Sequence, residues 1–150
     1  MLATKPVRLQ IGELLAADPT TLAPVANANK VVLIKSAFTP NELLTPADLT
    51  PADFDGSTAK LAAVGTQQAG LDPATGDQVI TIVEPVGSWR WETTGTTNLP
   101  QTIYGYGLYD NTLATLLGIA LLPAPLTLQI VGQQINLGTV AMTVVAQPLN

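Results

Sequence analysis

Short apolar segments, separated by turns rich in glycine and proline, run through most of this chain. Segments of this kind, enriched in β-branched and aromatic residues, are typical of β-strands. We predict strands at Lys30–Phe38, Ser57–Thr66, Asp77–Glu84, Ser88–Thr94, Gln101–Tyr109, Leu113–Leu122, Leu126–Val131 and Gln134–Val145. About eight strands at a spacing of roughly ten residues predict an all-β fold, a jelly-roll-like β-sandwich. We assign residues 1–29 to an N-terminal arm or cover segment and residues 30–150 to a single sandwich domain.

The segment Gln101–Tyr109 carries two glycines on one face of the predicted strand. Gly105 and Gly107 alternate with Tyr104 and Tyr106, so the glycines share the face opposite the two rings. Glycine inside a strand often marks a place where backbone or an aromatic ring approaches closely. We therefore predict a close contact on the glycine face.

The sequence Thr-Pro-Ala-Asp occurs twice between Thr45 and Phe54. Each copy places threonine at a helix N-cap, proline at the first helical position and an acid three residues after the cap. This pattern predicts one short helical element around Thr45–Asp55, made of one or two helical turns.

The stretch Leu113–Val131 has no charged residue and is long enough to cross a membrane as a helix. Pro123 and Pro125 lie inside it, and each removes an amide donor that a helix needs. No basic cluster flanks the stretch. We therefore predict two buried strands around a Pro-Ala-Pro corner and no membrane span. The first residues also lack the apolar run of a signal peptide.

The composition limits the chemistry that the chain can perform. Hydrophobic residues make up 47% and charged residues 11% of the chain, and there is no His and no Cys. Ordinary domains carry about 25% charged residues. Histidine-based catalysis, thiolate chemistry and zinc sites with N or S ligands are excluded. A net charge of −5 argues against nucleic-acid binding. We expect no enzyme activity, no cofactor and no metal.

The last forty residues, from Asn111 to Asn150, contain no charged side chain. They are either the central strands of a sandwich or a subunit interface, where charge is depleted at the core. Both interpretations can hold together.

The carboxylates offer weak candidates for chemistry. Asp53 and Asp55 flank Phe54, and such a pair could serve a glycosidase or hold a cation. Asp72 and Asp77 flank a turn and could hold calcium, but turn formation explains them better. Helix capping and loop formation account for these acids without catalysis.

Four aromatic residues, Trp89, Trp91, Tyr104 and Tyr106, lie on neighbouring predicted strands. They could form a platform for a carbohydrate, in which case Trp89, Trp91 or Tyr104 is exposed in a groove. Aromatic residues this few in a sheet protein more often lie in a core or an interface. We expect the core or interface to contain Trp89, Trp91, Ile103, Tyr104, Leu108, Ile119, Leu121, Leu128, Ile130, Ile135 and Leu137.

Several motifs between residues 30 and 145 resemble a family of small accessory structural proteins of tailed bacteriophages. An early strand at Val31–Phe38 is followed by an acidic-aromatic-glycine unit at Asp53–Gly56 and by a strand containing tryptophan. A threonine-rich loop then leads into Pro-Gln-Thr-Ile-Tyr-Gly-Tyr and a short turn, and Asn98–Asp110 is the most specific piece of the pattern. A proline corner and the unit Gly132–Ile135 complete the pattern.

The resemblance implies a non-enzymatic virion subunit made in the host cytoplasm. A capsid decoration or cement protein that bridges capsomers is favoured over a tail-fibre or baseplate module, because the chain is one compact domain. The alternative from another class is a soluble carbohydrate-binding β-sandwich. The implied partners are the major capsid protein or other virion subunits, with a homo-oligomer (dimer or trimer) expected. Interface candidates are Trp89, Trp91, Tyr104, Tyr106, Leu126, Leu128 and Ile130.

Overall fold

The computed structural model describes residues 2–3, 30–61, 66–71, 78–83, 89–109, 112–137 and 141–146. The regular structure of these residues is strands and one short helical turn, so the predicted all-β class is confirmed. The elements are β1 (Leu2–Ala3), β2 (Lys30–Ile34), the 3₁₀ turn η1 (Pro46–Asp48), β3 (Lys60–Leu61), β4 (Thr66–Leu71), β5 (Gln78–Val83), β6 (Trp89–Glu92), β7 (Gln101–Tyr109), β8 (Leu116–Leu128), β9 (Gln134–Leu137) and β10 (Ala141–Ala146).

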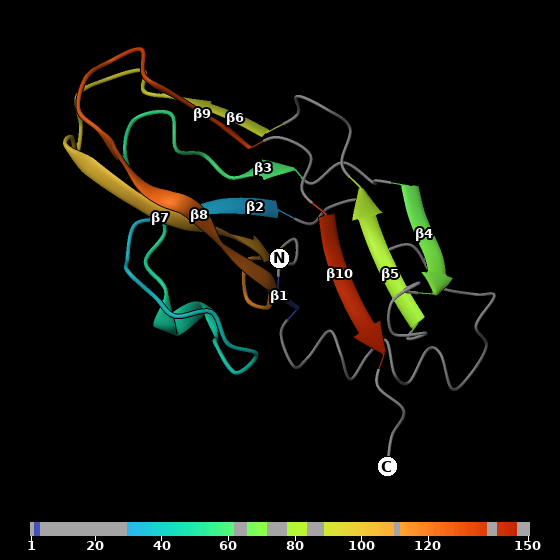
Figure 1. Ribbon diagram of the computed structural model, residues 1–150. Helices are drawn as coiled ribbons and strands as arrows, with labels where there is room; N and C mark the ends of the chain where they lie inside the picture. The colour runs from blue at the N-terminus through green and yellow to red at the C-terminus, as the bar shows by residue number, and fades with distance from the viewer. Residues whose placement is uncertain are drawn as a thin grey trace.

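The strands pair antiparallel in three groups (Figure 1). A five-stranded sheet has the order β1-β8-β7-β2-β3, a three-stranded sheet has the order β10-β5-β4, and β6 pairs with β9 in a ribbon. Of the predicted arm at residues 1–29, only Leu2–Ala3 is described, and it pairs with β8 at Ile119 and Gly118. The rest of that segment lies outside the described residues.

Most predicted strands appear where the pattern placed them. β2, β5, β6 and β7 lie within their predicted segments, and β7 has the predicted bounds. The segment Ser57–Thr66 is a strand only at Lys60–Leu61 and at the start of β4, and residues 62–65 are not described. The sequence pattern missed β4, because Thr-Gln-Gln-Ala-Gly-Leu lacks the β-branched alternation typical of a strand. The predicted strand Gln134–Val145 contains two strands, β9 and β10.

The predicted separation of two strands at Pro123–Pro125 is wrong, because β8 continues through both prolines. Ile103 pairs with Leu126 and Gly105 pairs with Leu121, so four residues of β8 lie opposite Tyr104 alone. The prolines therefore lie in a bulge, where no ladder hydrogen bond is required of them.

The five-stranded sheet is covered on both faces, which explains why β2 is an unbroken apolar run. Val31 and Leu33 face the β6–β9 ribbon, and Val32 and Ile34 face the opposite side, so all four are buried. The ribbon-side core consists of Val31, Leu33, Phe54, Trp89, Trp91, Ile103, Leu108, Leu128, Ile135 and Leu137.

The other face of the sheet is covered by residues 35–53, which we call the strap and which contain η1 (Figure 1). Leu49 of the strap packs in a second buried cluster with Val32, Ile34, Tyr109, Leu116 and Ile119 of the sheet, and Phe38, Leu44 and Ala59 are partly buried against this cluster. Burying each large apolar side chain contributes about 1.5–3 kcal/mol, so the strap is part of the fold and not an accessory loop.

The close approach predicted at the two glycines of β7 is confirmed. A Cβ atom at Gly105 would lie 2.6 Å from the Phe38 ring and 2.3 Å from the Ala120 carbonyl oxygen. A Cβ atom at Gly107 would lie 2.7 Å from the Tyr109 ring. Only glycine leaves room for these rings, so the glycine face of β7 is where the strap-side aromatics pack.

The two Thr-Pro-Ala-Asp units fold differently. In the first, Thr45 caps η1, and the Asp48 carboxylate accepts hydrogen bonds from the Thr45 amide at 2.9 Å and hydroxyl at 2.7 Å. In the second, Pro51 forms a bridge with Ile34, and the strap runs extended beside β2. The capping prediction therefore holds for the first unit only, because the second unit pairs with β2 and is extended.

Candidate functional site

Two motifs far apart in the sequence meet at one end of the five-stranded sheet. The unit Asp53–Gly56, which we call the DFDG loop, lies against the loop Thr93–Gln101 that precedes and begins β7. Phe54 anchors the DFDG loop because its ring is buried in the ribbon-side core. The backbone amide of Thr94 donates to the Asp55 carbonyl at 2.9 Å. Both motifs are visible in the sequence, but no local pattern predicts that they touch.

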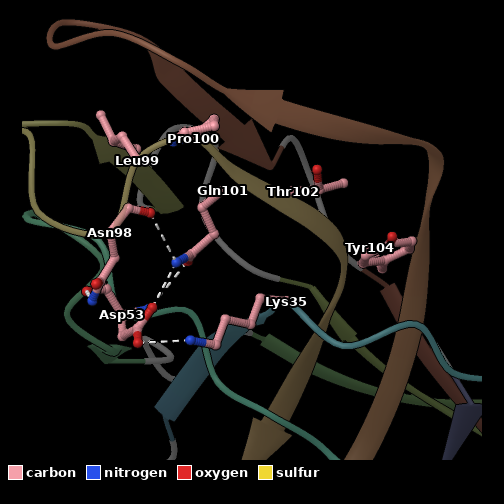
Figure 2. A pocket seen from close by; sticks show the side chains of 8 residues that line it. All are labelled: Lys35, Asp53, Asn98, Leu99, Pro100, Gln101, Thr102 and Tyr104. Carbon is pink, nitrogen blue, oxygen red and sulfur yellow. Dashed lines mark hydrogen bonds and ion pairs between the residues drawn. The ribbon is translucent and has the colours of Figure 1, made fainter.

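Asp53 is the centre of the hydrogen bonds between these loops (Figure 2). Gln101 donates its Nε2 to Asp53 Oδ1 at 2.5 Å and accepts at Oε1 from the Asp53 amide at 3.1 Å. Lys35 Nζ lies 2.6 Å from Asp53 Oδ2. Asn98 donates its Nδ2 to the Asp53 carbonyl at 3.0 Å. Strap, DFDG loop and β7 are thus joined through one carboxylate.

These contacts favour the ionised form of Asp53. The hydrogen bond from Lys35 and that from Gln101 lower the pKa of the Asp53 carboxyl below its ordinary value. The carboxylate is about half exposed, at 49%, so solvent screens the ion pair and its contribution to stability is small. The ion pair between Lys35 and Asp53 therefore positions the strap relative to the DFDG loop more than it stabilises the fold.

The side chain of Asp55, the second acid of the predicted pair, holds the backbone of the neighbouring loop. Its Oδ2 accepts a hydrogen bond from the Thr97 amide at 3.3 Å, and it lies where a side chain at Gly95 would be. Gly56 has φ +101°, and a Cβ atom there would overlap the Glu92 carbonyl. The spacing of Asp53 and Asp55 therefore serves loop packing, with Phe54 between them turned into the core.

A shallow, open hollow of about 470 Å³ lies beside Asp53 (Figure 2). Its walls are polar on the side of the DFDG loop and carry an aromatic ring on the side of β7. The lining residues are Lys35, Asp53, Asn98, Leu99, Pro100, Gln101, Thr102 and Tyr104. Asn98 has φ 56°, a left-handed conformation that asparagine tolerates better than most residues.

Three interface candidates lie in the core. Trp89, Trp91 and Leu128 are 4%, 1% and 1% exposed, so none is on a surface that another molecule can reach. The alternation of β6 turns both tryptophans into the ribbon-side core and leaves Arg90 and Glu92 exposed. A carbohydrate platform built on Trp89 and Trp91 is therefore ruled out by their burial.

The remaining candidates are more accessible. Tyr104 is partly buried and lines the hollow, and Tyr106 is partly buried against the ribbon-side core. Leu126 is 40% and Ile130 66% exposed. Leu121 and Ile130 were assigned to core or interface, and their exposure excludes the core of this chain.

The turn Gln129–Gln133 holds Ile130 and Val131, which we call the apolar tip, away from the rest of the protein. Thr93, only 1% exposed, donates its hydroxyl to the Ile130 carbonyl at 2.7 Å and accepts from the Gln133 amide at 2.9 Å. The Gln133 side chain accepts from the amides of Gln129 and Ile130. The tip is therefore a fixed structure with two adjacent apolar side chains in solvent.

Sequence reasoning did not single out Lys35, Asn98 or Gln101 as site residues. A signal for Gln101 exists, because it occupies an inward position of β7 and is buried although polar. A buried amide of this kind needs hydrogen-bond partners. Lys35 similarly ends the apolar run of β2 at the edge of the strap. Neither signal identifies the partner, which is distant in the sequence.

The described residues contain no group of three acidic side chains that could hold a metal ion. Within the same ranges, none of the helical structure has the length and apolar character required to cross a membrane. Asp72, Asp77 and the turn predicted between them lie outside the described residues.

A scan against protein-family models gives no match, and neither do searches of curated proteins and of solved structures. Function is therefore inferred from the residues of this chain.

Proposed function

We propose that this protein is a non-enzymatic structural subunit of a tailed-phage virion, and that it decorates or cements the capsid by bridging capsomers. Its partners in this proposal are the major capsid protein and further copies of the chain, as a dimer or trimer. It acts on the capsid surface after synthesis in the host cytoplasm. The motifs between residues 30 and 145 are the origin of the proposal.

The observation that carries the proposal is the apolar tip. Single exposed apolar residues are common on monomers and need no explanation. Ile130 and Val131 differ because they are adjacent, 66% and 49% exposed, and fixed by a buried threonine. A rigid apolar projection loses little conformational entropy on docking, which favours a protein contact there.

The surroundings of the tip support the same function. Residues 112–137 contain no charged side chain, and Leu121 and Leu126 are also exposed within them. Depletion of charge is the compositional mark of the central part of an interface. A virion subunit uses such neutral surface repeatedly, in symmetric contacts.

The two acids of the DFDG loop support a structural role over catalysis. Asp53 and Asp55, the only carboxylates of the DFDG loop, are both engaged in hydrogen bonds that hold this loop against Thr93–Gln101. The loop is one of the motifs that carry the family resemblance, and Gln101, which it contacts, belongs to another of them, Asn98–Asp110. These two motifs therefore contain residues that hold together one end of the sheet.

The jelly-roll-like sandwich of about eight strands belongs to this proposal as well. The ribbon β6–β9 packs on the five-stranded sheet through the ribbon-side core, and this layering supports a sandwich.

The test is the copy number of the protein in purified particles of the phage that encodes it. Quantitative mass spectrometry against the major capsid protein measures it. The proposal predicts hundreds of copies in each particle. A few to a few dozen copies would assign the protein to the tail-fibre or baseplate alternative, and absence from the particle would overturn the virion role.

A further inference from the structure

We propose that the hollow between Asp53 and Tyr104 binds a neutral, hydroxyl-rich ligand, namely a sugar unit of a glycan. This inference does not depend on the virion role. It also differs from a platform built on the tryptophans, which their burial excludes.

The charges of the hollow favour a neutral ligand. Among the described residues that line it, only Lys35 and Asp53 are charged, and they pair with each other at 2.6 Å. An anion would meet the Asp53 carboxylate, and a cation would meet the Lys35 ammonium group. A hydroxyl group can donate to the carboxylate and accept from the ammonium group at once.

The polar wall keeps hydrogen-bonding capacity for a ligand. The Lys35 ammonium group has three donors, and the ion pair with Asp53 engages one face of it. The Asp53 carboxylate can accept about four hydrogen bonds, and the described residues supply those from Lys35 and Gln101. Asn98 directs Nδ2 to the Asp53 backbone and leaves its Oδ1 as an acceptor. Adjacent donors and acceptors of this kind match the vicinal hydroxyls of a sugar.

The opposite wall supplies an apolar face. Tyr104 is partly buried on β7 and lines the hollow across from Asp53 and Asn98 (Figure 2). A tyrosine combines an apolar ring with a polar tip, and the C–H face of a sugar ring packs on such a ring. Tyr104 lies opposite the bulge of β8, so it has no regular cross-strand partner on that strand.

The size and rigidity of the hollow fit a small ligand. Its 470 Å³ is in the range of roughly 300–1,000 Å³ that small-molecule sites occupy. Hydrogen bonds from Gln101 and Asn98 fix Asp53 before a ligand arrives, and preorganisation of this kind favours binding. Because the hollow is open, we expect a Kd on the order of 1 mM for a monosaccharide.

Saturation-transfer difference NMR on the full chain tests the site with glucose, galactose, mannose and N-acetylglucosamine, each alone. We expect transfer to at least one of them. Tyr104→Ala should weaken binding of that sugar by roughly tenfold, and Tyr104→Phe, which keeps the ring, should restore most of it. Asp53→Asn should weaken binding because it removes the charged acceptor.

Glu92→Gln is the matched control for Asp53→Asn. Glu92 is 44% exposed and pairs with Arg90 at 3.0 Å, much as Asp53 pairs with Lys35, but it does not line the hollow. Circular dichroism shows whether each variant folds. If Tyr104→Ala does not fold, the effect of Asp53→Asn on sugar binding decides whether the hollow is the binding site. No transfer to any of the four sugars would overturn the site, as would transfer that Asp53→Asn and Glu92→Gln leave equally unchanged.

Discussion

The hydroxyl of Thr93 donates a 2.7 Å hydrogen bond to the backbone carbonyl of Ile130, across thirty-seven positions of the sequence. The donor is 1% exposed, whereas the side chain of Ile130 is 66% exposed. A buried polar group thus fixes the position of an exposed apolar one. This relationship distinguishes the apolar tip from an apolar residue in an ordinary surface loop.

Thr93→Val should destabilise the protein by about 1–3 kcal/mol. Valine has nearly the same shape, but it leaves the Ile130 carbonyl and the Gln133 amide without their partner. Urea unfolding followed by circular dichroism measures the change. Thr93→Ser keeps the hydroxyl and should lose clearly less stability, so equal losses in the two variants would contradict a role for the hydrogen bonds.

Gly105→Ala should destabilise the protein by about 1–3 kcal/mol, because an added methyl group overpacks a filled site. Its Cβ atom would lie 2.3 Å from the Ala120 carbonyl oxygen and 2.6 Å from the Phe38 ring. The same unfolding experiment measures it. Gly132→Ala is a useful comparison, since no atom lies within 4 Å of its Cβ and only the positive φ opposes it. A Gly105→Ala variant as stable as the parent would show that the strap does not pack as described.

The hydroxyl of Tyr109 should make the protein sensitive to alkaline pH. Burial raises the pKa of Tyr109 to about 12, above its ordinary value of 10.0. Folding therefore favours the neutral phenol. The associated stability is fully present below pH 10 and is lost as the pH rises toward 12. Unfolding free energy measured between pH 8 and pH 12 should fall over that window.

Tyr109→Phe should remove this part of the alkaline loss. The Tyr109 hydroxyl is buried and has no hydrogen-bond partner among the described residues, so its removal should be neutral or stabilising by about 1 kcal/mol at neutral pH. A loss of several kcal/mol at neutral pH would instead reveal a partner for this hydroxyl.

Local patterns predicted the strands that alternate regularly or are continuously apolar. β7 was found with its bounds because its glycines, tyrosines and flanking turn residues alternate along nine positions. β4 was missed because its strand character comes from pairing with β5 and not from its own side chains. Tertiary pairing overrides intrinsic preference in such segments.

The repeated Thr-Pro-Ala-Asp unit shows more directly that tertiary pairing overrides local preference. The first copy forms η1, and its Asp48 carboxyl has a pKa below the ordinary value because Thr45 donates hydrogen bonds to it. In the second copy, the Lys35 amide donates to the Thr50 carbonyl, and the Ala52 amide donates to the Leu33 carbonyl. Identical tetrapeptides thus differ because only one of them lies beside the edge of β2.

The candidate site could be predicted only in pieces. Asp53 was recognised as one of an acid pair, and Tyr104 as an aromatic residue on a strand. Their common hollow depends on Lys35, Asn98 and Gln101, whose partners are not adjacent in the sequence. No local pattern reports that the DFDG loop and the start of β7 meet.

The central claim is that the apolar tip attaches this protein to the virion, and a competition for incorporation tests it most directly. Wild-type protein and an Ile130→Asp, Val131→Asp double variant, distinguished by mass, are supplied in equal amounts during assembly of a phage that lacks its own copy. Both residues are exposed, so the variant should fold with nearly unchanged stability. Leu43→Asp, an equally exposed apolar residue on the strap, is the control.

Purified particles should contain the wild type at least about tenfold over the double variant, because a buried charge at an interface costs several kcal/mol. The Leu43→Asp control should enter as well as the wild type. Equal incorporation of wild type and double variant, or the absence of both from the particles, would contradict the account.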